Sequence, residues 1–194
     1  MKIRDYYRHH FRGDLHRFML AAELPYFGHG WEVHCKNLER VPTDTRAEFV
    51  FCLYFTVLVD QAMLIHFPEY YEDFEKVTCY PKFCHGLGQF HKKPQEILAG
   101  PIKQGLVSRA KLGQLLDPGM ELFVEEVAAY FQNHQKDIET DIFLERLVSD
   151  QNVQMPLIFV FANPELEDDI QFLAYEALRK AVNKKLKARV EQAV

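Results

Sequence analysis

The segment Thr45–Phe67 reads TRAEFVFCLYFTVLVDQAMLIHF, and this stretch decides the fold. It opens with a capping box, in which the Thr45 hydroxyl can cap the first turn of a helix and the Glu48 carboxylate can cap back. The run that follows is apolar on nearly every side and ends at Pro68. Such a helix is buried all round, so the sequence predicts a central buried helix at about 45–67. A β-strand over 49–57 is the competing interpretation, because aromatic and β-branched residues are frequent there.

Shorter patterns on both sides of this run predict further helices. An apolar stripe at helical spacing covers 15–22 and ends before Pro25. Asn163-Pro164 is a typical helix start, and the acidic-then-basic order of the residues after it complements a helix dipole. We therefore expect a long C-terminal helix at about 164–192. Asp117-Pro118-Gly119 has the composition of a turn and predicts a break between two helices.

Composition is typical of one globular domain. The chain has 194 residues, of which 48% are hydrophobic and 26% are charged, and it includes 16 Phe and 9 Tyr. Aromatic side chains bury large areas, so a packed core needs no disulfides at this length. No linker or repeat divides the sequence, and only 157–161 reads equally well as a strand. The expected fold class is therefore all-α, a single compact helical bundle over 1–194.

The N-terminal residues are too polar for the apolar stretch of a signal peptide, and Asp60 interrupts the longest apolar run. A charge at the centre of a bilayer costs about 2.5–3.5 kcal/mol on insertion scales, so a buried helix is favoured over a membrane span. We expect a soluble, cytoplasmic protein that makes no membrane contact and keeps its four cysteines as reduced thiols.

Charge is distributed unevenly along the chain. The net charge is −5, but residues 1–17 carry +3 and residues 176–194 carry +4, which leaves −12 for the residues between them. The basic ends could meet the acidic middle of the same chain, or they could meet an anionic partner.

Common nucleotide-binding and hydrolase motifs are missing. Gly100 and Gly105 have the glycine spacing of a phosphate-binding loop, but Leu106 and Val107 occupy the positions that need Lys and Ser or Thr. Two groups of residues could instead hold a transition metal, with zinc or iron as the candidate cofactor.

The first group is Cys79, Cys84, His85 and His91, four nitrogen and sulfur ligand types in a loop punctuated by Gly and Pro. Their spacing fits no known zinc module, so a loop with two packed thiols is the favoured alternative. The second group is His134, Asp137 and Asp141, which stack on one helix face at i, i+3 and i+7. An imidazole with two carboxylates suits iron or zinc between helices. A hydrogen-bonded His and a capping Asp are favoured over this site.

Three more residues are candidates for buried polar groups, namely Asp60 and His66 in the central run and Glu23 at the end of the first stripe. Asp60 lies among aliphatic residues, where a carboxylate without a basic partner would be a functional candidate. An ion pair with a neighbouring helix is the favoured interpretation.

Basic residues alternate with aromatic ones near the N-terminus, a pattern that suits single-stranded nucleic acid. The candidate anion-binding residues are Arg4, Arg8, His10, Arg12 and Arg17. Arg4-Asp5 and His10 also fit the short Arg-polar-x4-His pattern of some helical HEPN-type ribonucleases, but so short a pattern recurs by chance and assigns no family. The aromatic residues are better explained as a docking face inside the protein.

Three function classes follow from these observations. A helical interaction or adaptor protein with a protein partner is favoured, because no catalytic motif is present. A metal- or small-molecule-dependent enzyme and a nucleic-acid binder or ribonuclease are the alternatives. The sequence gives no substrate, no partner identity and no oligomeric state.

Overall fold

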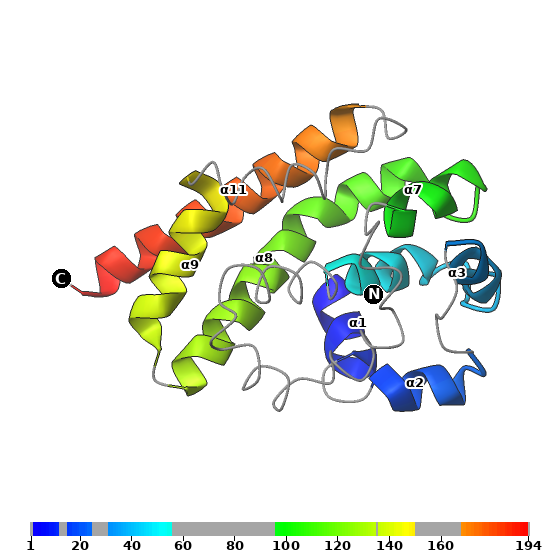
Figure 1. The fold of residues 1–194 in the computed structure, drawn as a ribbon, viewed down its shortest axis with the longest axis horizontal. Helices are drawn as coiled ribbons and strands as arrows, with labels where there is room; N and C mark the ends of the chain where they lie inside the picture. Colours follow the sequence, from blue (N-terminus) through cyan, green and yellow to red (C-terminus); the bar gives the residue numbers. More distant parts are fainter. Residues whose placement is uncertain are drawn as a thin grey trace. The chain divides into compact units, whose positions relative to one another are not determined.

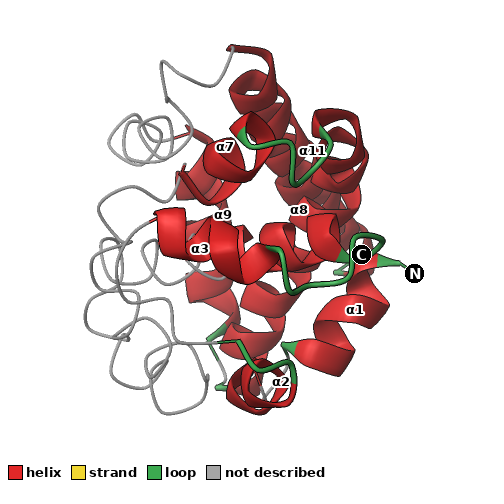
Figure 2. Cartoon of the chain, turned by 90° about the vertical axis from the view of Figure 1, so that its right-hand side faces the viewer, coloured by secondary structure: helices red, strands yellow, loops and turns green. Residues whose placement is uncertain are grey.

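The computed structural model describes residues 2–11, 15–24, 31–55, 96–134, 136–149 and 168–193. Within these ranges 82% of the residues are helical and none is in a strand, which confirms the all-α prediction. Figure 2 shows this described part as helices joined by loops. Contacts divide the chain into two compact units, 1–115 and 116–194, which are described in turn. The single domain over 1–194 stays a prediction.

The first unit contains four labelled helices (Figure 1): α1 (Ile3–His10), α2 (Leu15–Ala21), α3 (Trp31–Leu38) and α7 (Glu96–Lys103). A helical segment at 46–55 and the first turns of α8 (Arg109–Asn133) complete its described part. The pair α3 and α7 pack against each other. The stripe at 15–22 is confirmed as α2, and its Met19 is buried, at 2% exposure.

The segment 46–55 is the centre of this unit. Its residues from Phe49 to Phe55 are at most 1% exposed, as expected for a helix that is apolar all round. Rings from α1 and α2 pack on it, with ring centroids 4.9 Å apart for Tyr7 and Phe55 and 5.9 Å apart for Phe18 and Phe49. Helix rather than strand is therefore found over 49–55, and the rest of the predicted helix lies outside the described residues.

This helix starts where the sequence predicts, but its capping box does not form. The Phe49 N–H donates to the Thr45 carbonyl at 3.0 Å, which is the first helical hydrogen bond. The Thr45 N–H already donates to the Pro42 carbonyl at 3.0 Å, so it is not available to the Glu48 carboxylate. The Thr45 hydroxyl also donates to Pro42, and Glu48 instead lies 3.7 Å from the Lys111 ammonium.

The second unit contains the rest of α8 together with α9 (Asp137–Ser149) and α11 (Asp168–Gln192). In this unit α9 lies across α11 and contacts it (Figure 1). Phe143 and Leu144 of α9 and Leu178 and Val182 of α11 are fully buried. The long C-terminal helix is confirmed over 168–192, and its predicted start at Asn163-Pro164 lies outside the described residues.

The predicted turn at Asp117-Pro118-Gly119 is wrong, because α8 runs through it without interruption. Proline lacks the N–H of the helical ladder, a loss that normally disfavours a helix interior. Here Leu116 and Met120 on either side are at most 4% exposed, so burial of this part of α8 outweighs the local preference.

None of the described helices combines the length and the apolar character that crossing a bilayer requires.

Candidate functional site

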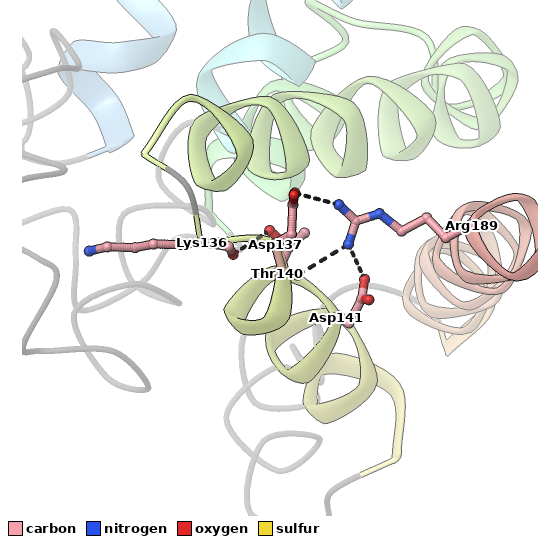
Figure 3. A network of polar contacts seen from close by, with 5 residues as sticks. All are labelled: Lys136, Asp137, Thr140, Asp141 and Arg189. Atoms are coloured by element: carbon pink, nitrogen blue, oxygen red, sulfur yellow. Dashed lines mark hydrogen bonds and ion pairs between the residues drawn. The ribbon is translucent and has the colours of Figure 1, made fainter. Parts of the chain in front are cut away.

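A group of polar side chains in the second unit joins α9 to α11 through Arg189 (Figure 3). Its guanidinium donates to the Asp137 carboxylate at 2.7 Å, to the Asp137 backbone carbonyl at 3.1 Å and to the Asp141 carboxylate. The Arg189 side chain is 25% exposed, whereas those of Asp137 and Asp141 are 60% and 42% exposed. The two carboxylates raise the pKa of Arg189 against the opposing effect of burial, which is the largest single contribution. Arg189 therefore holds the N-terminal turn of α9 in place.

The structure gives these two carboxylates a partner that the sequence did not predict. His134 does not share their arrangement, because its Nδ1 lies 2.9 Å from the Tyr130 carbonyl at the end of α8. Among the described residues, no group of three or more His, Cys, Asp or Glu side chains is placed to hold a metal ion. The predicted shared face requires one continuous helix through these three residues. In the structure α8 ends at Asn133 and a separate helix, α9, begins at Asp137.

One side of α9 faces solvent. Ile138 is 76% exposed and Ile142 is 39% exposed, and four residues apart on a helix they lie on one face. The opposite face is buried, with Phe143 and Leu144 at 0% exposure. Thr140 lies there as well, and its hydroxyl donates to the Lys136 carbonyl at 3.1 Å, which satisfies a buried polar group.

Basic side chains of α11 meet acidic ones of the same unit. Lys184 pairs with Glu121 of α8 at 2.8 Å, Arg179 with Glu176 at 2.9 Å, and Lys187 lies 3.8 Å from Glu191. The pair of Lys184 with Glu121 and the bonds of Arg189 to Asp137 and Asp141 show that part of the basic C-terminus meets acidic residues from the middle of its own chain, one of the two outcomes that the charge pattern allows. The other two pairs lie within the basic segment itself.

Near the N-terminus, the aromatic residues belong to the core. Tyr6, Tyr7 and Phe11 are at most 3% exposed, so their faces are not available to stack on bases. Burial is the main cause that raises the pKa of the Tyr6 hydroxyl well above its usual value.

The basic residues of this region differ in their surroundings. Arg8 is exposed, whereas Arg4 and Arg17 each interact with other residues of the chain. His10 packs between the rings of Tyr6 and Phe18, with centroid distances of 4.6 and 4.4 Å, and burial lowers its pKa. Arg12 lies outside the described residues.

Glu23 is exposed and is not a buried carboxylate. It follows α2 with a backbone φ of 54°, in the left-handed region. The Leu24 N–H donates to the Met19 carbonyl at 2.7 Å and the Glu23 N–H donates to Leu20 at 3.0 Å, which is the pattern of a Schellman motif. The other candidates, Asp60, His66, Cys79, Cys84, His85 and His91, lie outside the described residues.

Arg46 was not predicted from the sequence, although it connects several parts of the first unit. Its guanidinium donates to the backbone carbonyls of Glu39, Val41 and Leu106 at 3.1–3.3 Å. Nothing in the local sequence indicates these bonds, because backbone acceptors carry no sequence signature.

No family model, curated protein or solved structure matches the chain.

Proposed function

We propose that the chain is a helical protein-interaction module, and that its partner binds the exposed face of α9. The observation that carries this proposal is the exposure of Ile138, which is 76% and is the largest among the large hydrophobic side chains of the described residues. Ile142 extends the same face by one helical turn. Adjacent exposed apolar residues between polar ones are typical of a binding surface.

The setting of this face favours binding. Phe143 and Leu144 anchor the opposite side of α9 in the core, and Arg189 fixes its first turn through Asp137 and Asp141. A helix that is held in place before binding loses little conformational entropy when a partner arrives. Two apolar anchors at i and i+4 suit a helix or a groove on another protein.

The two alternative functions have less support from the described residues. A nucleic-acid binder would need exposed rings, and Tyr6, Tyr7 and Phe11 are buried. A metal- or small-molecule-dependent enzyme rests on His134, Asp137, Asp141, Asp60 and Glu23. Asp137 and Asp141 bind Arg189, and Glu23 is exposed, while Asp60 lies outside the described residues. Elemental analysis of the purified protein and a salt-dependent shift of labelled RNA test these two alternatives directly.

The experiment for the interaction proposal places a photo-crosslinking amino acid at position 142 in the full chain. A captured protein is then purified and its affinity is measured by calorimetry for the wild type and for Ile138→Glu. We expect the substitution to weaken binding at least about tenfold, because a charge replaces an apolar anchor.

Leu20→Glu is the matched control. Leu20 of α2 is also a large exposed hydrophobic residue, at 58%, but it is not part of the α9 face. We expect this variant to bind like the wild type. Equal losses for both variants, or no protein crosslinked from position 142 above the yield from position 20, would overturn the proposal.

A further inference from the structure

We draw no further inference here: the strongest candidate, the buried side-chain cluster of Glu48, Cys52 and Tyr6 where the central helical segment meets α1, has its carboxylate already paired with the Lys111 ammonium at 3.7 Å, and nothing in the described part of the chain shows a ligand that the cluster would hold.

Discussion

The Arg46 guanidinium donates a hydrogen bond to the backbone carbonyl of Leu106, 60 positions later in the chain, at 3.3 Å. Its other N–H groups donate to the carbonyls of Glu39 and Val41. One side chain thus connects the end of α3, the start of the central helical segment and the turn after α7. Carbonyl groups at such places lack helical partners, and a cation is well suited to them.

Replacing Arg46 with Met should lower the free energy of unfolding by about 2–4 kcal/mol, because several carbonyls lose a charged donor at a half-buried place. Urea unfolding followed by circular dichroism measures this change. Arg40→Met is the control, since within the described part of the chain Arg40 donates one hydrogen bond, to the exposed Glu23 carbonyl at 2.8 Å. Its loss should cost about 1 kcal/mol or less. Similar losses for the two variants would contradict the assignment.

Replacing Glu23 with Gly should stabilise the protein by about 1 kcal/mol, because a side chain pays a steric penalty at positive φ that glycine avoids. Glu23→Val should have the opposite sign, since a β-branched residue fits this conformation worst. Thermal and urea unfolding of both variants give the comparison. If glycine destabilised the protein, the left-handed cap after α2 would not be present in solution.

Replacing Arg189 with Met should lower the free energy of unfolding by about 1 kcal/mol, a modest value because its carboxylate partners are half exposed. The free energy of unfolding of Arg189→Lys should lie between that of the wild type and that of Arg189→Met, because lysine keeps the charge but not the forked geometry. The difference from wild type should shrink in 1 M NaCl.

The matched control is Lys187→Met, because Lys187 and Glu191 are 3.8 Å apart and both largely exposed. We expect almost no change in stability for it. A Lys187 effect as large as that of Arg189 would show that general helix charge, and not the contact with α9, accounts for the result.

Stability should depend on pH through His10. Its pKa in the folded protein is lowered, first by burial and then by the neighbouring His9. The unfolded chain therefore binds more protons between this pKa and about 6.5, so stability rises with pH through that window and is flat above it. Urea midpoints at pH 5 and pH 7.5 should differ less for His10→Gln than for the wild type. His9→Gln should reduce the difference only in part, and an unchanged difference in His10→Gln would contradict the prediction.

Much of the fold is readable from the sequence because its signals are local. The apolar run after Thr45, the stripe of α2 and the charge order of α11 each describe one element and its buried side. The capping box was wrong although the helix start was right, since Pro42 supplies an acceptor that competes for the Thr45 N–H. The turn at Pro42 therefore replaces the predicted capping interaction, while the helix still starts where the sequence predicts.

The candidate site was less predictable, because it depends on helical phase and on distant partners. Placing His134, Asp137 and Asp141 on one face required a single helix, and the break after Asn133 separates them. In α9 as it forms after this break, Ile138 is 76% exposed. Arg189 lies 48 residues from Asp141, and no spacing in the sequence could indicate their contact.

Pro118 affects how the helix α8 unfolds locally. Because it has no N–H, it cannot donate to the carbonyl four residues earlier, and this gap in the ladder falls where one compact unit ends and the next begins, between Leu115 and Leu116. The two halves of α8 need not exchange their amide protons together. Amides around Phe123–Phe131 should follow the opening of the second unit, while those around Leu112 follow the first, so that hydrogen exchange divides one continuous helix into two cooperative parts.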